Sequence, residues 1–452
     1  MSLIERLPAI VRQSREEYEN ARANSSVRFL LTEQIGGPSQ NQLVLGDNAA
    51  YMAWLLNEKQ MEGKIDLIYI DPPFFTQNKF NSEIKLRSKR VRTLAAIKTT
   101  AYSDQFNRSL PDYLVMLASR LYLMRDLLAD SGSLFVHLDW HAAHYVKILL
   151  DEIFGEKRFV NEIIWHYKSG GVSRRHFARK HDTILFYSKT ANYYFQPQQE
   201  KSYNRGFKPY RFKGVREYKD ERGWYTMVNR KDVWLLPMVG RTSAERTGYV
   251  TQKPEALTDR LIDSCTPQGA LCADFFGGSG TLAASADRLG RKWISVDSGE
   301  LACLYAGQRL ARAGAAFDFY RFEETEKNQL NIAAIKIDAT VEPLVGSEQK
   351  RLRVRLVDYR LPEDWTFPVS QEDLPLLRQV LTQEPLLIVS AWSVDLKPDG
   401  NIHRPERLLS RDNDGLAIEF EAIGRQFGSI GVAVTDLFGN RSYMIVEPKE
   451  FV

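Results

Sequence analysis

Four consecutive residues, Asp71-Pro72-Pro73-Phe74, place a carboxylate, two prolines and an aromatic ring directly after the apolar run 65–70. Ligands of open α/β sheets bind beyond the carboxyl ends of the strands, so a site is expected there. Each proline fixes φ and lacks an N–H donor, which leaves the neighbouring carbonyls free to accept hydrogen bonds. The pattern indicates a rigid cluster of acceptors beside a ring. The alternative is a proline turn that ends a strand, and the tetrapeptide alone does not decide between the two.

An acceptor cluster of this kind suits an amino group that has two protons to donate. The exocyclic amine of a nucleobase is a poor nucleophile because its lone pair is conjugated with the ring. Holding both N–H bonds on fixed acceptors favours the pyramidal form, in which the lone pair points outward. The ring of Phe74 can stack on a base that has left the duplex. The acceptors would bind more strongly as positive charge develops on nitrogen, which stabilises the transition state.

A second candidate site runs from Ala273 to Thr281, with the sequence ADFFGGSGT, at a predicted strand-to-helix junction. Glycines there allow close approach to the helix N-terminus, whose N–H groups bind anionic ligand groups. Asp297 ends the strand-like run 293–296, and an acid in that position commonly binds ribose hydroxyls. A nicotinamide dinucleotide enzyme would have a similar turn and acid, so this half alone is ambiguous. The phosphate loop Gly-x-x-x-x-Gly-Lys-Ser/Thr does not occur in this segment.

Alternating strands and helices are expected to position both sites, which predicts a parallel α/β sheet. Strands are predicted at 42–45, 65–70, 133–138, 270–275 and 293–296, and helices at 49–56, 113–128, 141–154, 254–265 and after Gly280. Residues 1–40 predict a polar helix followed by a loop, and 191–234 have no clear periodicity. After residue 325, short β-rich runs (351–359, 386–394, 417–423, 430–434) and a hairpin turn at 438–440 before 443–446 predict a small β-sandwich.

Composition limits the functional classes. The 452 residues suffice for two or three domains. No apolar run of about 20 residues occurs, and the charged N-terminus has no apolar signal core, so a cytoplasmic location without membrane contact is expected. Its three cysteines form no Cys-x-x-Cys pair. From Glu323 onward the chain has 22 acidic and 15 basic residues, which gives this part a net charge of −7. Because the whole chain carries +4, residues 1–322 carry a net charge of +11. A basic N-terminal part suggests a polyanionic ligand, although ordinary solvated surface is the alternative.

Together the two sites, with Thr251-Gln252-Lys253-Pro254 just upstream of the second, resemble the amino-group DNA methyltransferases of the β class. That class is circularly permuted, so that its Asp-Pro-Pro-aromatic half precedes the cofactor half, as positions 71 and 274 do here. The chain is most similar to adenine-specific modification enzymes of Type III-like restriction systems. Further matches are Gly132–His137, Asp139–His141 and Leu150–Gly155, and the resemblance covers about residues 40 to 310.

The resemblance implies a Rossmann-like fold that binds S-adenosyl-L-methionine. It implies that Asp71, Pro72, Pro73 and Phe74 hold the target base. The residues that it assigns to the cofactor are Asp47, Asn48, Thr251, Gln252, Lys253, Pro254, Asp274, Phe275, Phe276, Gly277, Gly278, Ser279, Gly280, Thr281 and Asp297. Within that set, Asp297 would bind the ribose and Asp47 the adenine. Phe275-Phe276 departs from the commoner Pro-Phe of the family.

The expected reaction is methyl transfer to a nitrogen of a flipped-out base by direct displacement. Methylation of cytosine C5 needs a cysteine nucleophile, which the C5 family presents as Pro-Cys, and this dipeptide is absent. The acid before the two prolines favours adenine N6, as in the resembling enzymes. A cytosine-N4 enzyme, an inactive DNA-recognition subunit and an RNA methyltransferase are the alternatives.

Two basic segments are expected to bind double-stranded DNA. Residues 191–234 hold ten Lys or Arg, five acids and eleven aromatics, where the family keeps its target-recognition domain. Residues 76–108 hold eight Lys or Arg and two acids. The predicted DNA contacts are Lys85, Arg87, Lys89, Arg90, Arg92, Arg205, Lys208, Arg211 and Lys213. A β-rich insertion with a solvated face is the alternative for 191–234.

The expected organisation has five parts. They are an N-terminal helical extension (1–40), a catalytic half (41–190), a target-recognition insertion (191–250), a cofactor-binding half (251–322) and a C-terminal β-rich domain (323–452). No metal is expected, although His137, His141 and His144 invite that reading, because methyl transfer from a sulfonium needs no Lewis acid. A restriction nuclease subunit and a second copy of the chain are conceivable partners.

Overall fold

The computed structural model describes residues 2–24, 27–74, 79–86, 95–103, 109–168, 174–323, 332–367, 369–412 and 415–450, with the backbone alone for 79–86 and 95–103. Its centre is a ten-stranded sheet with the order β1-β15-β2-β14-β13-β3-β6-β8-β7-β12. In that order the strands are Phe29–Ile35, Phe317–Phe322, Gln42–Leu45, Lys292–Asp297, Leu271–Asp274, Ile65–Ile70, Leu128–Leu138, His181–Ser188, Phe159–His166 and Val233–Leu235.

The sheet is mixed, whereas the sequence pattern predicted a parallel one. The strands from β15 through β6 run parallel to one another, but β1 pairs antiparallel with β15, and β8 pairs antiparallel with both β6 and β7. A parallel pair needs a long crossover connection, usually a helix. No helix is described between β7 and β8, and these strands run antiparallel.

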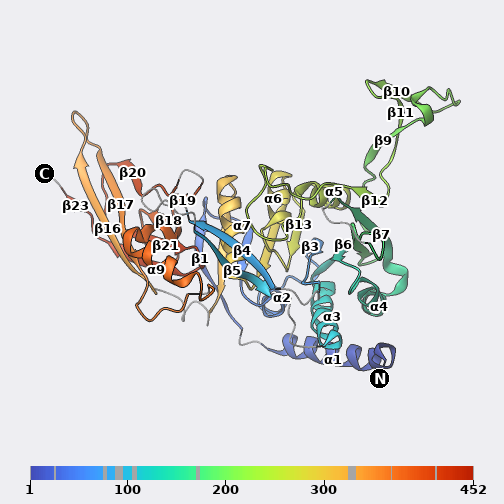
Figure 1. Ribbon diagram of the computed structural model, residues 1–452, viewed down its shortest axis with the longest axis horizontal. Helices are drawn as coiled ribbons and strands as arrows, with labels where there is room; N and C mark the ends of the chain where they lie inside the picture. The colour runs from blue at the N-terminus through green and yellow to red at the C-terminus, as the bar shows by residue number, and fades with distance from the viewer. Residues whose placement is uncertain are drawn as a thin grey trace.

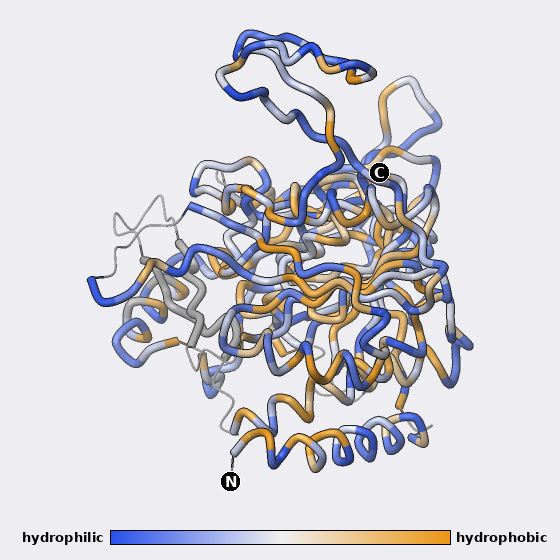
Figure 2. The backbone as a smooth tube through the Cα atoms, turned by 90° about the vertical axis from the view of Figure 1, so that its right-hand side faces the viewer, coloured by the Kyte–Doolittle hydropathy of each residue, from blue (hydrophilic) through white to orange (hydrophobic). Residues whose placement is uncertain are grey.

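Helices cover both faces of this sheet, as the alternating pattern predicted (Figure 1). The helices are α1 (Leu3–Ala23), α2 (Asn48–Asn57), α3 (Leu110–Leu127), α4 (Ala143–Phe154), α5 (Glu255–Cys265), α6 (Thr281–Arg288) and α7 (Glu300–Arg312). One apolar cluster packs side chains of α1 to α4 against the sheet, and a second cluster does so for α5 to α7. The central strands are correspondingly the most continuously hydrophobic part of the chain in Figure 2.

Several elements differ from their predicted bounds. The predicted loop before residue 40 contains β1, whose mixed sequence FLLTEQI has no clean apolar period. Helix α4 begins at Ala143 rather than His141, because the Asp139 carboxylate accepts the His141 N–H and holds a turn there. Strands β7, β8 and β15 were not predicted, nor were the strand β16 (Ala334–Pro343) and the helix α9 (Leu374–Gln383).

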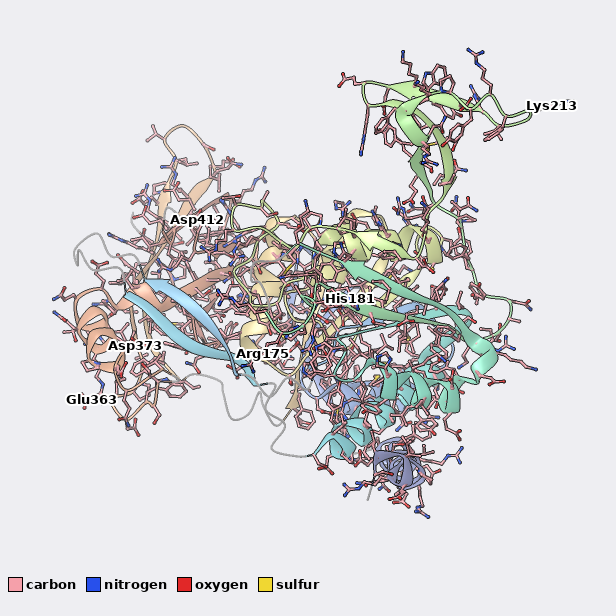
Figure 3. All side chains as sticks on the ribbon, turned by 45° about the vertical axis from the view of Figure 1, so that its right-hand side comes forward. Arg175, His181, Lys213, Glu363, Asp373 and Asp412 are labelled. Atoms are coloured by element: carbon pink, nitrogen blue, oxygen red, sulfur yellow. The ribbon has the colours of Figure 1, made fainter. Side chains whose placement is uncertain are left out.

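Residues 199–229 form a separate three-stranded sheet that projects from the body as an arm (Figures 1 and 3). Its strands are β9 (Gln199–Tyr203), β10 (Glu217–Asp220) and β11 (Gly223–Asn229) in the order β10-β11-β9, with a 3-10 turn at Arg205–Phe207. This segment, which had no predicted structure, returns to the main sheet through β12. A further antiparallel pair joins β4 (Lys79–Leu86) and β5 (Ala95–Ser103).

The C-terminal part contains two four-stranded sheets that share one apolar cluster. One has β20 (Glu419–Gly424), β17 (Lys350–Arg360), β16 (Ala334–Pro343) and β23 (Lys449–Glu450), and the other has β19 (Arg407–Ser410), β18 (Val389–Asp395), β21 (Ile430–Asp436) and β22 (Arg441–Val446). Helix α9 (Leu374–Gln383) and the 3-10 turn Pro385–Ile388 precede β18, and the 3-10 turn Glu156–Arg158 precedes β7. Within the described residues, no helix is long and apolar enough to cross a membrane.

Candidate active site

Acidic residues at or just beyond the carboxyl ends of neighbouring parallel strands define the site. Asp71 follows β3, Asp274 ends β13 and Asp297 ends β14. The register pairs Ala273 with Ile68 and Asp274 with Ser295, so the three acids lie along one edge of the sheet. This edge is where open α/β sheets bind ligands, so the fold brings the two sequence-predicted sites together.

The carboxylate of Asp71 is held on one side and open on the other. Its Oδ2 accepts a charge-assisted hydrogen bond from Lys253 Nζ. Its Oδ1 is buried and has no hydrogen-bond partner in the structure. Leaving a buried acceptor unsatisfied costs roughly 1–3 kcal/mol, which a ligand donor would recover. Asp71 therefore presents one oriented, free acceptor.

The ring of Phe74 lies over a buried polar network. Its centroid is 5.8 Å from that of the His137 ring, and Lys253 Nζ lies 4.9 Å from the Phe74 centroid. The two ring nitrogens of His137 contact Tyr69 Oη at 2.9 Å and Asp182 Oδ2 at 3.2 Å. The other Asp182 oxygen accepts from Tyr167 Oη at 3.0 Å. These residues fix the surface beneath Phe74.

Asp182, Tyr69 and Tyr167 were not predicted as site residues. Burial alone would raise the pKa of Asp182, but the hydrogen bond from His137 and the charge of Lys253 lower it below its ordinary value. A carboxylate at the start of the apolar strand β8 is the signal that could have found Asp182. His137 was noted only as a potential metal ligand.

Asp274 begins the glycine-rich turn at the neighbouring strand. Its Oδ1 accepts the Phe276 N–H at 2.9 Å. Complete burial, with the nearby charges of Asp71 and Asp297, raises the pKa of Asp274 well above its ordinary value, although Lys253 acts in the opposite direction. Lys253 is thus the cation that interacts with both acids of the two sites.

The glycines of this turn leave space that side chains would fill. A Cβ on Gly277 would collide with the Ser295 hydroxyl, and one on Gly280 would lie 2.9 Å from Ala306 Cβ. Gly278 and Gly280 have φ of +50° and +71°, a region that other residues rarely adopt. Ser279 and Thr281, both buried, complete the turn into α6, and Phe275 is fully buried beneath it.

Asp297 is locked by two backbone donors. Its Oδ2 accepts the Gly278 N–H at 2.8 Å and its Oδ1 accepts the Gly299 N–H at 2.8 Å. Burial raises the pKa of Asp297 despite these hydrogen bonds. Each carboxylate oxygen keeps a second lone pair, so the group can still accept from a hydroxyl.

Asp47 follows β2, the parallel neighbour of β14, so it lies next to Asp297 on the same edge. The Asp47 carboxylate already caps α2 through the Ala50 N–H at 2.9 Å and pairs with Arg120 at 2.9 Å. Arg120 also binds Asn48 Oδ1 at 2.6 Å, and Asn48 donates to the Phe275 carbonyl at 2.7 Å. Arg120, which was not predicted, therefore joins these two residues to the glycine turn.

The segment Thr251–Pro254 joins the two halves. The Gln252 amide accepts from Thr247 and donates to the Glu245 carbonyl, so it closes its own loop. Thr251 has a φ of +67°, Pro254 precedes α5, and the Lys253 carbonyl accepts from Thr281 at 3.2 Å. Lys253, which was predicted to contact the cofactor, contacts the Asp71 carboxylate.

These features fit S-adenosyl-L-methionine. The turn from Asp274 to Thr281 is a cradle that a Cβ would fill, and Asp297 and Asp47 follow adjacent strands beside it. Backbone N–H groups at the start of α6 suit a carboxylate, and the two acids suit hydroxyl and amine donors.

The predicted DNA contacts occupy different places. Arg205, Lys208, Arg211 and Lys213 lie on the arm, with Lys213 at its far end in Figure 3. Lys85 belongs to β4, whose side chains are not described, and Arg87, Lys89, Arg90 and Arg92 lie outside the described residues.

The three histidines that invited a metal reading have different surroundings. His141 Nδ1 lies 2.6 Å from Asp139, and His144 is exposed on α4, while His137 lies in the buried network. In the part of the chain that the structure describes, no three His, Cys, Asp or Glu residues are placed to hold a metal.

Sequence comparisons identify relatives among modification enzymes. The Type II methyltransferase M.EcaI of Enterobacter cloacae is 29% identical over 341 residues, which cover 62% of this chain and 71% of that protein. The EcoP15I Mod subunit, from a Type III restriction-modification enzyme of Escherichia coli, is 28% identical over 33% of this chain but only 24% of its own length. The solved M1.HpyAVI–SAM complex is 17% identical, covers 60% of this chain and 98% of its own, and has a TM-score of 0.38.

The family model described as a DNA methylase, N6_N4_Mtase, matches residues 65–308, which is more than half of the chain. That region begins at β3, includes Asp71 and Asp274, and ends within α7. The chain therefore belongs to the N6_N4_Mtase family of DNA methylases.

Proposed function

We propose that this chain methylates adenine N6 in double-stranded DNA by direct displacement on a flipped-out base. This proposal is supported by the carboxylate of Asp71. Its Oδ1 is buried and has no hydrogen-bond partner among the described residues, while its Oδ2 accepts a hydrogen bond from Lys253 Nζ. An exocyclic amine bound there would donate one N–H to Oδ1 and the other to a carbonyl of the double-proline turn. Phe74, supported by the His137 network, would stack on the base.

The reaction needs little covalent chemistry from the protein. Bound S-adenosyl-L-methionine would supply an electrophilic methyl group and retain the bonding electrons on its sulfur. The amine nitrogen forms the new bond to carbon, and Asp71 stabilises the positive charge that develops there. One proton then leaves the nitrogen. Asp71 is thus a catalytic acceptor, and Lys253 is a positioning residue that fixes the carboxylate.

Nucleophilic attack by a cysteine is disfavoured. Cys265, Cys272 and Cys303 are all buried and unpaired. Burial raises the pKa of Cys265 to about 12, so its thiolate form is scarce at neutral pH. With no Pro-Cys in the chain, transfer to an amino nitrogen is the better supported chemistry.

Adenine is favoured over cytosine because an acid precedes the two prolines, as in the adenine enzymes that the sequence resembles. Cytosine N4 offers the same two N–H donors, so it is the second candidate. An inactive recognition subunit is less well supported, since it has no use for the free acceptor of Asp71.

We further propose that the arm is the target-recognition insertion and that the chain order reflects the permuted β class. The two C-terminal sheets would form a β-sandwich domain. Type III Mod subunits are named as parts of restriction-modification enzymes, so a nuclease partner is proposed here, as is a dimer.

The test is methyl transfer from tritiated S-adenosyl-L-methionine to unmethylated duplex DNA, followed by digestion to nucleosides and mass spectrometry. We expect label in N6-methyl-2′-deoxyadenosine. Label in N4-methyl-2′-deoxycytidine would replace the adenine assignment with the second candidate. Label in single-stranded RNA but not in DNA would contradict the proposed substrate.

A further inference from the structure

A second cavity lies on the α5 side of the sheet, at the base of the arm. It has a volume of about 350 Å³ and is open to solvent, which places it within the size range of small-ligand pockets. Its walls include the buried rings of Phe186 and Trp234 and the half-exposed ring of Phe195. The cavity lies at the C-terminal end of α5, which carries Ser264 and Cys265. The N-terminal end of α5 follows Lys253, which contacts Asp71. The cavity is therefore separate from the methyl-transfer site.

Two guanidinium groups, Arg230 and Arg260, line this cavity. Arg230 Nε is buried and has no hydrogen-bond partner among the residues that the structure describes. Arg260 lies over the Trp234 ring at 5.3 Å. Burial and the charge of Arg230 lower the pKa of Arg260, while Glu200 acts weakly in the opposite direction. The two cations are thus close enough to repel each other.

No described acid forms an ion pair with either arginine, although Asp232 also lines the cavity. Both side chains are partly buried, so an anion bound between them would relieve their mutual repulsion and the cost of desolvating their charge. Two converging guanidiniums present the planar donors that bind phosphate oxygens in pairs. The half-exposed ring of Phe195 beside them suits a flat ring, which can stack on it.

We propose that this cavity binds a nucleotide unit, with its phosphate on Arg230 and Arg260 and its base against the aromatic wall. Both strands that connect the arm to the body border it, because Gln198 precedes β9 and Arg230 follows β11. The Arg230 N–H donates to the Gln198 carbonyl at 2.8 Å, which ties these two connections together. A ligand at this point would stiffen the base of the arm.

The nucleotide can come from two sources, a strand of bound DNA or a free nucleotide. Binding is measured without methyl transfer, so this inference does not rest on the proposed function and can fail separately from it. The full-length protein is first saturated with S-adenosyl-L-homocysteine to fill the cofactor cleft. Calorimetry then compares adenosine 5′-monophosphate, adenosine and inorganic phosphate.

We expect the monophosphate to bind more tightly than adenosine, and the Arg230→Gln/Arg260→Gln variant to lose roughly tenfold or more in that affinity. Arg222→Gln is the matched control, because Arg222 lies on the arm against Tyr203 and should leave the affinity unchanged. Equal binding of nucleoside and monophosphate by the wild-type protein would overturn the proposal, even if the double variant does not fold. So would an unchanged affinity in a folded double variant.

A duplex of about 20 base pairs then distinguishes the sources. If the duplex displaces the monophosphate and the double variant weakens both ligands, the cavity takes a nucleotide of DNA. If duplex and monophosphate bind together, it takes a free nucleotide.

Discussion

At the scale of single residues, Lys253 connects the two halves of the site. It donates to Asp71, lies over Phe74, and its charge acts on both Asp182 and Asp274. The charge of Lys253 helps to lower the pKa of Asp182 and opposes the rise in the pKa of Asp274. The sequence placed Lys253 in the cleft but assigned it to the cofactor, because no sequence pattern shows that it contacts a residue 182 positions earlier.

We therefore expect Lys253→Met to move the acidic limb of the pH–rate profile to higher pH, by about one unit or more. The acid cluster would take up protons more readily without the lysine charge. Lys253→Arg should restore most of the wild-type profile. An unshifted profile with only a lower maximum would show that Lys253 acts through folding alone.

The glycine turn supports a prediction about cofactor binding. In Gly277→Ala the new methyl group would meet the Ser295 hydroxyl, so the turn must shift. Affinity for S-adenosyl-L-methionine should fall at least about tenfold, measured by calorimetry. Gly428→Ala, where nothing lies within 4 Å of a new Cβ and φ is not left-handed, controls for the general cost of replacing a glycine. Equal cofactor affinity in the two variants would contradict this role.

At the scale of elements, the strands that were predicted are those whose sequence is a continuous apolar run. Strands β3, β13 and β14 were predicted because each is an apolar run that ends at or just before an acid, and this placed the site. The strands of the arm were not predicted. The reason is that β9, β10 and β11 have no buried face and their residues are largely charged or aromatic. An edge strand such as β1 is hard to predict for the related reason that polar residues interrupt its apolar pattern.

The basic side chains of the arm lead to a prediction for DNA binding. Replacing Arg205, Lys208, Arg211 and Lys213 by glutamine should weaken binding to duplex DNA. The slope of log affinity against log salt should fall by about 0.9 for each phosphate that the arm no longer neutralises. Affinity for S-adenosyl-L-methionine should be unchanged. A salt dependence identical to that of the wild type would exclude the arm as a phosphate-binding element.

At the scale of the whole molecule, β1 links the methylase sheet to the C-terminal sheets. Backbone hydrogen bonds join Gln34 N–H to the His403 carbonyl and His403 N–H to the Thr32 carbonyl, both at 2.9 Å. Arg441 pairs with Glu33 at 2.9 Å across the same interface. These bonds join segments some 370 residues apart, so neither local periodicity nor motifs predicted them.

His403 makes this interface sensitive to acid. Burial lowers its pKa to about 4, although the charges of Glu33 and Asp395 act in the opposite direction and that of Arg441 acts with burial. A histidine with a lowered folded-state pKa contributes stability above pH 6.5, and this contribution disappears as pH falls toward 4. The full decrease is roughly 3 kcal/mol.

The free energy of unfolding should therefore fall more steeply between pH 6.5 and 4 in the wild type than in His403→Gln. Glutamine can keep the hydrogen bond that the His403 ring makes with Ser393 at 2.8 Å. Denaturant titrations at several pH values measure the free energy of unfolding of both proteins. Subtracting one curve from the other removes the contribution of the other titratable groups, because both proteins share them. Parallel curves for the two proteins would contradict the assignment.

We propose that Asp71 is the acceptor that holds the target amine, with the cofactor bound independently beside it. Asp71→Ala tests this through tritiated methyl transfer to duplex DNA, combined with calorimetric binding of S-adenosyl-L-methionine to the same variant. We expect no transfer above background and cofactor affinity close to that of the wild type. Methyl transfer at the wild-type rate by this variant would contradict it.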